Sequence, residues 1–378
     1  MAGIYLHIPF CKQACTYCNF HFSTSLKQKE DLLAALSKEI ALAKDYLGNE
    51  PVETIYFGGG TPSLLSADEL NRLFEKLFHT FSVGNLKEIT LEANPDDLDA
   101  AYLKALRTTP VNRFSIGVQS FREEDLRYMH RAHSAQQADG AIKRAQDAGF
   151  TNLSIDLIYG TPGLTDVAWK DNLDKVQALN IPHFSSYALT VEEGTALYHA
   201  ILKKKTTPVD AGQSAGQFGI LMAHALQMGY EHYEISNLAV PGMYAVHNTA
   251  YWQGKPYLGL GPSAHSFNGK AERRWNMANN ALYIKSILEE KKIPFEKEAL
   301  TDTEQLNEYI MTSLRTMWGC RLEYIEQQWG NDTVKTLTQE ATPYIEKGQM
   351  LFKDNTLFLT SEGRFFADAI AGDLFFEE

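Results

Sequence analysis

The sequence predicts an α/β protein, a partial TIM-like (β/α)6 barrel followed by a small winged-helix-like α+β domain at the C-terminus. Strand-like and helix-like segments alternate six times before residue 230, which is typical of a parallel sheet. Polar residues follow the ends of many successive strands, which favours a barrel over a doubly wound sheet with one switch point. These residues are Cys11, Gly58, Gly59, Gly60, Glu92, Gln119, Asp156 and Tyr187.

The six repeating units follow one another without a long linker. The strand-like segment GIYLHIPF precedes residues 27–47, where Leu32, Leu36 and Ile40 recur at helical spacing. The segment TIYF precedes a helical run that opens with Ser66 and Glu69, the S-x-x-E form of a capping box. The other four strand-like segments are ITLEA, RFSIGV, LSIDLIYG and HFSSYALT, and each precedes a helix-like run.

We expect three parts in this chain, since 378 residues exceed the length at which one hydrophobic core keeps growing. Residues 1–230 form the barrel, and residues 231–300 are a segment of shorter strands rich in Gly, Pro, Tyr and Asn. Residues 301–378 form the winged-helix-like domain, with a second capping box at Thr301 and Glu304 and a hairpin that turns at Asp354 and Asn355.

The charge balance argues against nucleic acid as a partner. The formal net charge is −12, and residues 301–378 carry 14 acidic and six basic side chains. The winged region is therefore expected to act as a lid or a docking surface. No apolar run approaches the ~20 residues that cross a bilayer, and the first residues lack the features of a signal peptide. We expect a cytoplasmic protein without membrane insertion.

Three of the four cysteines, Cys11, Cys15 and Cys18, stand at C-x3-C-x2-C spacing directly after the first strand. Clustered thiols in a reducing compartment indicate metal ligands, and this spacing suits soft metals or an iron–sulfur cluster. Two alternatives remain: a zinc knuckle completed by His21, or three buried cysteines without metal. A four-iron cluster held by three thiolates leaves one iron open to a non-protein ligand. The distant Cys320 is expected to be a buried or incidental thiol.

The spacing and four further motifs resemble the radical S-adenosylmethionine (SAM) superfamily. In that superfamily SAM chelates the open iron, and reduction cleaves its C–S bond to give a 5′-deoxyadenosyl radical. The closer resemblance is to the coproporphyrinogen-dehydrogenase-like branch, which includes oxygen-independent coproporphyrinogen III dehydrogenase and the HemW-type haem chaperones. The matching segments are YLHIPFCKQACTYC, FGGGTPS, LEANPDDL, FSIGVQSF and IDLIYGTPG.

The resemblance implies that the three clustered cysteines bind a [4Fe-4S] cluster. It also implies SAM contacts, carried over onto Tyr5, Tyr17, Gly59, Gly60, Thr61, Glu92, Gln119, Arg131 and Asp156. Glycine suits this role because it lets the backbone approach a ligand without a Cβ, although a glycine triplet can also be a tight turn. Glu92 or Asp156 alone would more often cap a strand end, but the set on successive strand ends favours a site.

Three features favour the chaperones over the dehydrogenase. The dehydrogenase motif ends C-x2-C-x-C, whereas this sequence has Phe20 at the last position, and only ten residues precede Cys11. The stretch HNTAYW matches the H-N-x-x-Y-W motif of the chaperones, which implies that His247 binds haem. An imidazole suits haem iron and the neighbouring aromatic rings suit the macrocycle, although a lone His beside aromatics is more often a packed residue. Arg273 and Arg274 offer cations for the propionates.

We therefore expect a haem chaperone that binds a [4Fe-4S] cluster, SAM and haem. The resemblance implies delivery of haem to apo-haemoproteins such as membrane-associated respiratory enzymes. The alternative is an oxygen-independent coproporphyrinogen III dehydrogenase that removes hydrogen atoms from propionate side chains. A DNA-binding regulator that uses the winged domain is a third class, and the acidic charge of that domain argues against it.

Overall fold

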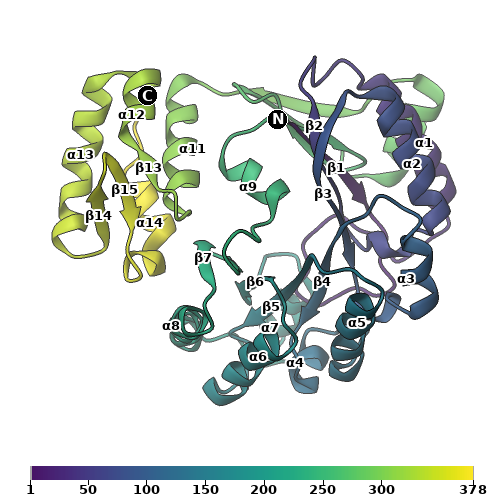
Figure 1. Cartoon of the computed structure of the whole chain (residues 1–378), viewed down its shortest axis with the longest axis horizontal. Helices are drawn as coiled ribbons and strands as arrows, with labels where there is room; N and C mark the ends of the chain where they lie inside the picture. Colours follow the sequence, from purple (N-terminus) through teal and green to yellow (C-terminus); the bar gives the residue numbers. More distant parts are fainter. Residues whose placement is uncertain (1, 378) are drawn as a thin grey trace.

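A computed structural model describes residues 2–377. Its centre is a curved parallel sheet of six strands in the order of the chain, with helices on the outer side (Figure 1). The strands are β1 (Ala2–Ile8), β2 (Val52–Gly59), β3 (Val83–Ala93), β4 (Arg113–Gln119), β5 (Leu153–Tyr159) and β6 (His183–Ala188). The helices between and after them are α1 (Lys29–Leu42), α2 (Ala67–Thr80), α3 (Ala100–Leu106), α4 (Glu123–Tyr128), α5 (Ala135–Asp147), α6 (Asp166–Ala178), α7 (Ala196–Leu202) and α8 (Ala211–Gln227). Short 3-10 turns, η1 (Pro62–Leu64) and η2 (Pro95–Asp97), follow β2 and β3.

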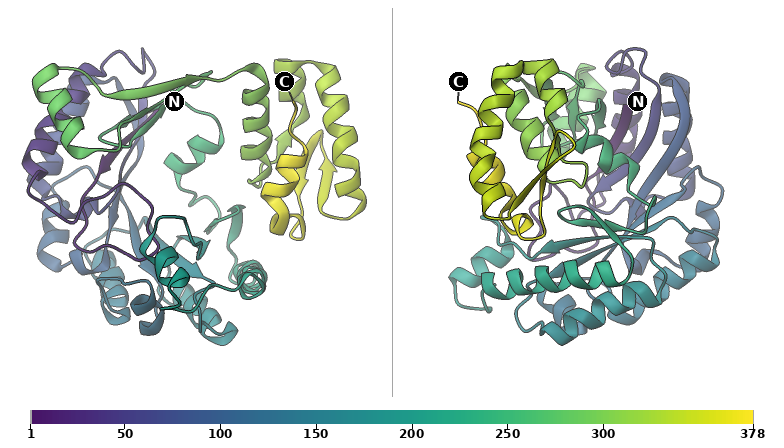
Figure 2. Two further views of the ribbon diagram at one scale, coloured as in Figure 1. Left: turned by 180° about the vertical axis from the view of Figure 1, so that it is seen from behind. Right: turned by 60° about the vertical axis from the view of Figure 1, so that its left-hand side comes forward.

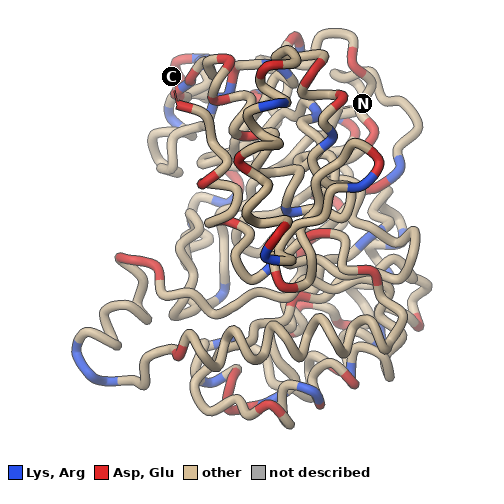
Figure 3. The backbone as a smooth tube through the Cα atoms, turned by 90° about the vertical axis from the view of Figure 1, so that its left-hand side faces the viewer, with Lys and Arg blue, Asp and Glu red and all other residues tan. Residues whose placement is uncertain are grey.

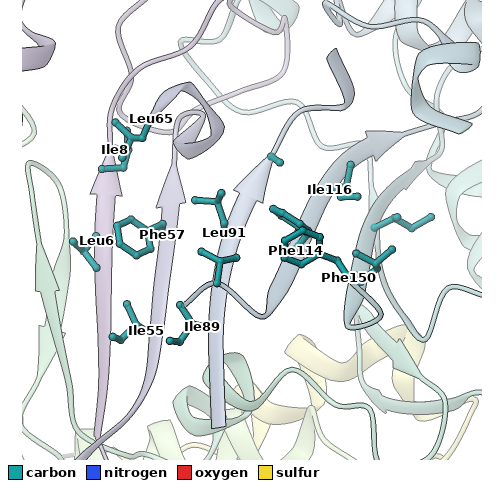
Figure 4. Packing of buried hydrophobic residues seen from close by; sticks show 14 of the residues in the cluster. Leu6, Ile8, Ile55, Phe57, Leu65, Ile89, Leu91, Phe114, Ile116 and Phe150 are labelled. Atoms are coloured by element: carbon teal, nitrogen blue, oxygen red, sulfur yellow. The ribbon is translucent and has the colours of Figure 1, made fainter. Parts of the chain in front are cut away.

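Side-chain alternation along the strands separates the hydrophobic core from the polar interior of the curve. Leu6, Phe57, Leu91 and Phe114 are fully buried and belong to the cluster that packs against the outer helices (Figure 4). The intervening residues face the concave side, where Tyr5 and Tyr56 are paired in register and their rings stack 6.0 Å apart. The concave side is therefore lined by polar and aromatic side chains, and the hydrophobic core lies on the convex side.

Six further strands extend both ends of this sheet, which has twelve strands in all. Strand β9 (Tyr257–Leu260) pairs in parallel with β1, and β10 (His265–Phe267), β11 (Glu272–Asn276) and β12 (Phe295–Ala299) follow antiparallel. At the other end β8 (Asn237–Ala239) and β7 (Glu231–Glu234) continue from β6. The outermost strands, β12 and β7, do not pair with each other within the described residues, so the predicted partial barrel is confirmed as an open one.

Helix α9 (Val246–Trp252) lies inside the curve of the sheet, between β1–β3 and the C-terminal domain (Figures 1 and 2). A residue of β3 holds this helix in place. The buried Glu88 carboxylate accepts hydrogen bonds from the backbone nitrogens of Val246 (2.8 Å) and His247 (3.0 Å). The sequence did not indicate this helix, since seven residues are too few for a helical period to show. On the outer side of the sheet, α10 (Asn280–Lys285) runs into a π-helical turn, η3 (Ser286–Glu290), and both pack against α1.

The C-terminal domain has its own hydrophobic core and a three-stranded antiparallel sheet. Its elements are α11 (Asp302–Leu314), β13 (Cys320–Arg321), α12 (Leu322–Trp329), α13 (Asn331–Glu346), β14 (Met350–Lys353), β15 (Thr356–Leu359), η4 (Gly363–Phe366) and α14 (Ala367–Asp373). The capping boxes predicted at Ser66 and Thr301 are both present. The predicted hairpin joins β14 to β15 through Asp354 and Asn355, both with positive φ.

Charge is spread over the surface with acidic positions gathered around the C-terminal end of the chain (Figure 3). No described helix is both long enough and apolar enough to pass through a bilayer. The division of the chain at residues 230 and 300 stays a prediction, although strands on both sides of residue 230 belong to one sheet.

Candidate cofactor and haem site

The three clustered cysteines lie in the loop after β1, and each is a free, partly exposed thiol. Burial raises the pKa of Cys11 to about 11 and also raises the pKa of Cys18, so metal binding at this loop must displace protons. The donor set suits an iron–sulfur cluster, since three thiols without disulfide partners converge on one loop. Phe20, which replaces the fourth cysteine of the dehydrogenase motif, points into solvent with 66% of its surface exposed.

Hydrogen bonds hold the cysteine loop against the loop between α4 and α5. The Thr16 nitrogen donates to the Met129 oxygen (3.1 Å), and the Gln13 side chain donates to the His130 oxygen (2.8 Å). From a different unit, the Leu197 nitrogen at the start of α7 donates to the Thr16 oxygen (2.7 Å). The loop that carries the thiols is therefore anchored from two other units of the barrel.

His21, the ligand that would complete a zinc knuckle, is engaged elsewhere. Its Nε2 atom is 2.7 Å from Oδ1 of Asn280 at the start of α10, and its backbone oxygen is 2.9 Å from Nε2 of His7. Among residues 2–377 no three His, Cys, Asp or Glu side chains are grouped as ligands of one metal ion. A four-iron cluster has several iron sites and takes thiols that are farther apart than those around one ion.

Arg131 connects the cysteine loop to the ends of β3 and β4. Its guanidinium donates to Sγ of Cys15 (3.2 Å), to Oδ1 of Asn94 (2.7 Å) and to the Gly117 oxygen (2.8 Å). Asn94 in turn donates to Oγ1 of Thr61 (3.2 Å). Asn94 was not among the predicted site residues, although it lies in the matched segment LEANPDDL. The structure thus brings Thr61, Arg131 and Cys15 into one network through a residue that the sequence analysis missed.

The glycine triplet after β2 packs too tightly for any side chain. Gly59 has a φ of +105°, and a Cβ there would lie 2.5 Å from the ring of His7. A Cβ on Gly60 would lie 2.6 Å from the Phe10 oxygen, and one on Gly58 would lie 2.8 Å from the ring of Tyr5. These glycines are therefore required by the packing of β2 on β1. The contact of Gly59 and Gly60 with SAM stays a prediction.

Glu92 at the end of β3 joins the glycine segment to the concave side. Its carboxylate accepts from the hydroxyl of Tyr56 (2.7 Å) and from the Gly59 nitrogen (3.1 Å). Burial raises the pKa of Glu92 to about 7, and nearby Asp156 adds to this shift. Burial likewise raises the pKa of Asp156 to about 6. Both carboxyl groups are thus poised to change charge near neutral pH.

Tyr17 and Gln119, the remaining predicted SAM residues, lie around Arg131. Arg131 and Cys15 both influence the pKa of Tyr17, which burial raises above its ordinary value. Gln119 has a φ of +66°, and a Cβ on Gly117 would contact both the Gln119 amide and the Arg131 guanidinium. The nine predicted SAM residues therefore fall into two groups, one around Arg131 and one around Glu92.

A cavity of about 390 Å³ opens on the concave side between β1–β3, α9 and the C-terminal domain. Its volume lies within the range of small-molecule sites. It brings together Tyr5 and Glu92 from the predicted SAM site and His247 from the predicted haem motif. The complete lining is Tyr5, Tyr56, Glu92, Tyr187, Glu234, Ser236, Asn237, His247, Asn248, Tyr251, Trp252 and Arg315.

His247 is 1% exposed, and both of its ring nitrogens have partners. Nδ1 is 2.8 Å from Oγ1 of Thr54, and Nε2 is 2.7 Å from the hydroxyl of Tyr251. Its ring stacks on Tyr56 with centroids 5.1 Å apart. Burial lowers the pKa of His247 to about 3, with Arg113 contributing, so the imidazole is neutral and retains a lone pair for a metal. Coordination through Nε2 requires the release of Tyr251.

Arg315, a residue that the sequence analysis missed, contributes the cavity's cation from the end of α11. Its guanidinium lies 5.7 Å from the ring centre of Trp252 and donates to Glu234 (3.2 Å) and Asp368 (2.5 Å). Arg273 and Arg274, expected near the propionates, are absent from the cavity lining. Arg273 pairs with Glu308, and Arg274 lies over the ring of Tyr46.

Comparison with known proteins shows the family of this chain. The family model "Radical SAM superfamily" matches residues 5–176, and the model "HemN C-terminal domain" matches residues 300–366. The chain is 32% identical over 375 residues to "Heme chaperone HemW" of Bacillus subtilis, an alignment that covers 98% of each chain. The chain belongs to the HemW family of the radical SAM superfamily. "Heme chaperone HemW" of Escherichia coli is a second HemW relative, 37% identical over 272 residues and 70% of this chain.

A solved structure confirms the fold of this HemW-family chain. "Coproporphyrinogen III oxidase (HemN) from Escherichia coli is a Radical SAM enzyme" superimposes with a TM-score of 0.85 at 24% identity, covering 99% of this chain and 89% of that one. The shared architecture includes the open parallel barrel and the C-terminal domain. Cys320 is fully buried in the core of that domain, which confirms the prediction of a buried thiol.

Proposed function

We propose that this chain is a haem chaperone that binds a [4Fe-4S] cluster, SAM and haem and delivers the haem to apo-haemoproteins. The observation that carries the proposal is the placement of His247 in an aromatic cavity that also reaches the predicted SAM residue Glu92. Membership of the HemW family supports it, because the full-length relative in Bacillus subtilis is named a haem chaperone.

The cluster and SAM belong at the ends of the first barrel strands. Cys11, Cys15 and Cys18 would hold the cluster, and the Arg131 guanidinium beside Cys15 offers a counter-charge to the thiolates. The cluster, when bound, would supply an open iron position for SAM. Glu92 and the Gly59–Thr61 backbone would bind and orient SAM, and the buried carboxylate suits its cationic sulfonium or its ribose hydroxyls.

The cavity suits haem in three respects. His247 offers a neutral imidazole, since its pKa is about 3. The rings of Tyr5, Tyr56 and Trp252 offer flat apolar faces to a macrocycle. Arg315 offers a cation for a carboxylate at the opposite wall. Access requires movement at this wall, because about 390 Å³ lies at the small end for a ligand site.

The recipients that we propose are haem-requiring respiratory enzymes at the membrane, reached from the cytoplasm by docking and without insertion. The acidic balance of residues 301–378 suits a protein-docking surface better than a nucleic-acid surface.

The test uses the full chain, reconstituted anaerobically with iron and sulfide. One arm loads the protein with haem and mixes it with the haem-free form of a b-type cytochrome, and the absorption of the recipient reports transfer. A second arm supplies coproporphyrinogen III, SAM and a reductant, and the product is analysed for protoporphyrinogen. We expect transfer in the first arm and no conversion in the second.

His247→Ala should lower haem loading in the first arm, whereas the matched Cys320→Ser variant should behave as wild type because Cys320 lies in a separate core. Conversion of coproporphyrinogen III would replace the chaperone proposal with the dehydrogenase. Absence of both transfer and haem binding would also overturn the proposal.

A further inference from the structure

The two nitrogens of the His247 ring face different surroundings. The Nδ1 side rests on the floor formed by β1 and β2, where a Cβ on Gly3 would lie 3.2 Å from Nδ1 and 3.0 Å from the adjacent carbon. Thr54, paired with Gly3 across the two strands, is bonded to Nδ1 at 2.8 Å. No ligand of the size of a macrocycle can reach Nδ1 on this side. Nε2 is therefore the nitrogen that can reach a bound metal.

Nε2 is covered by a residue of the same helix. Tyr251 stands four positions after His247 on α9, so that the two side chains lie on one face of the helix. The Tyr251 hydroxyl is 2.7 Å from Nε2, and the two rings meet edge to face with centroids 4.9 Å apart. Tyr251 itself is partly exposed and lines the cavity, while its ring packs against Tyr257. It is therefore free on its cavity side to turn away.

Metal binding through Nε2 would give the two hydroxyl groups opposite roles. A metal-binding histidine needs its other ring N–H bonded to an acceptor, which fixes the tautomer and the ring orientation. Thr54 occupies that position at Nδ1. With the proton on Nδ1, the lone pair is on Nε2, where the Tyr251 hydroxyl donates its hydrogen bond.

We propose that Tyr251 is a latch on His247: its hydroxyl holds the Nε2 lone pair in the haem-free protein and is displaced when haem iron binds. Thr54 is the positioning residue that keeps Nε2 turned to the cavity. The inference rests on the proposed haem-binding function and adds to it a barrier to haem capture. The same latch favours haem release, because Tyr251 can take the lone pair again as the iron leaves.

The variants are chosen to change single atoms. Tyr251→Phe removes the hydroxyl and keeps both ring contacts. Tyr257→Phe is its matched control, because it removes a hydroxyl from the adjacent ring that has no bond to His247. Thr54→Val removes the Nδ1 partner without changing the shape, and Thr54→Ser restores a hydroxyl.

Haem affinity is measured by absorbance titration of the full chain at matched cluster content, and the absorption band of bound haem reports the axial ligand. Tyr251→Phe should bind haem about two- to tenfold more tightly, because one competing hydrogen bond is lost. The haem band should be unchanged. Thr54→Val should weaken binding by roughly tenfold or more and shift the band, and Thr54→Ser should recover both. Tyr257→Phe should bind as wild type.

An unchanged or weaker affinity in Tyr251→Phe would overturn the latch, and a weaker one would make Tyr251 a direct support of the haem. Wild-type affinity in Thr54→Val would remove Thr54 from its role. The proposed function fails separately: if His247→Ala binds haem as wild type does, His247 is not the ligand, and the latch falls with it. If only Tyr251→Phe behaves unexpectedly, the haem site stands.

Discussion

At the scale of single residues, Gly59 has the tightest constraint in the glycine segment after β2. Its φ of +105° is unfavourable for any side chain, and its neighbour is the ring of His7, whose other contacts fix it in place. Gly59 also donates its backbone N–H to the Glu92 carboxylate. Conformation, packing and hydrogen bonding therefore coincide at one position.

Gly59→Ala should lower the free energy of unfolding by about 2–4 kcal/mol, because it combines backbone strain with overpacking against His7. Denaturant unfolding of the full chain measures the change. The matched control is Gly216→Ala in α8, where no atom lies within 4 Å of the new Cβ. That variant should be neutral or gain about 0.5–1 kcal/mol. Equal effects in the two variants would show that the packing around Gly59 is not as described.

Glu92 gives the site a dependence on pH. Burial raises its pKa to about 7, so the carboxyl group is largely protonated at pH 6 and ionised at pH 8. In the proposed SAM site a cationic sulfonium favours the ionised form, so SAM binding would release this proton at low pH. We expect the affinity for SAM to fall as the pH decreases from 8 to 6, by up to about tenfold per unit below the pKa.

Isothermal titration calorimetry of SAM at several pH values measures this dependence, with Glu92→Gln as the reference. The Gln variant should bind SAM more weakly at pH 8 and show a flatter profile. A wild-type affinity that rises on acidification, or a Gln variant with the wild-type profile, would exclude Glu92 as the titrating contact.

At the scale of elements, local sequence signals predicted local structure well. The capping boxes at Ser66 and Thr301 depend only on residues three apart, and both are present. The β14–β15 turn at Asp354 and Asn355 depends on residues that tolerate positive φ. The six alternating units correctly predicted the parallel order of β1–β6.

Long-range contacts could not be predicted in the same way. Thr54 meets His247 across 193 residues, and that meeting requires the register of β1 on β2 together with the position of α9. Arg315 reaches the cavity because α11 ends beside β7. Asn94 had the best signal among the missed residues, since it stands in a matched motif beside Glu92 at a strand end. The residue types indicated which side chains could belong to a site, but which of them contact each other depends on how the elements pack.

Glu88 is the contact that fixes α9 on the barrel. It accepts the backbone N–H groups of Val246 and His247 and lies 3.7 Å from Arg113, with both charged groups buried. Glu88→Ala should lower the free energy of unfolding by about 3 kcal/mol or more, because it leaves a buried guanidinium without its partner. It should also weaken haem binding, because α9 loses its anchor.

Thermal unfolding and haem titration measure the two effects, and Glu75→Ala on the exposed face of α2 is the control. Glu88→Gln, which keeps an acceptor oxygen, should lie between wild type and Glu88→Ala. A stable Glu88→Ala variant with full haem affinity would contradict the role of this contact.

At the scale of the whole molecule, the C-terminal domain closes one side of the cavity. Arg315 bridges Glu234 of the barrel sheet and Asp368 of α14 while lying over Trp252. The side chain of Ile235 packs against both hydrophobic cores. Any opening of the cavity toward this domain must therefore break the Arg315 contacts.

Arg315→Gln should lower the melting temperature and weaken haem binding, because Glu234 is left buried without its cation and the cavity wall loses its charge. The loss of stability should be about 1–3 kcal/mol, since Glu234 keeps its bonds to Ser236 and Asn237. Arg321→Gln, which removes an exposed cation paired with Glu323, is the control and should change neither property. Haem affinity equal to wild type in Arg315→Gln would exclude this wall from the site.

The proposed function depends on haem binding by His247 in the cavity between the barrel and the C-terminal domain. Haem titration of wild type and His247→Ala at equal iron–sulfur content tests it most directly. We expect one haem per wild-type chain. In the variant, haem binding should be at least about tenfold weaker and the haem band altered, while the cluster absorption stays the same. Equal affinity and identical haem spectra in the two proteins would contradict it.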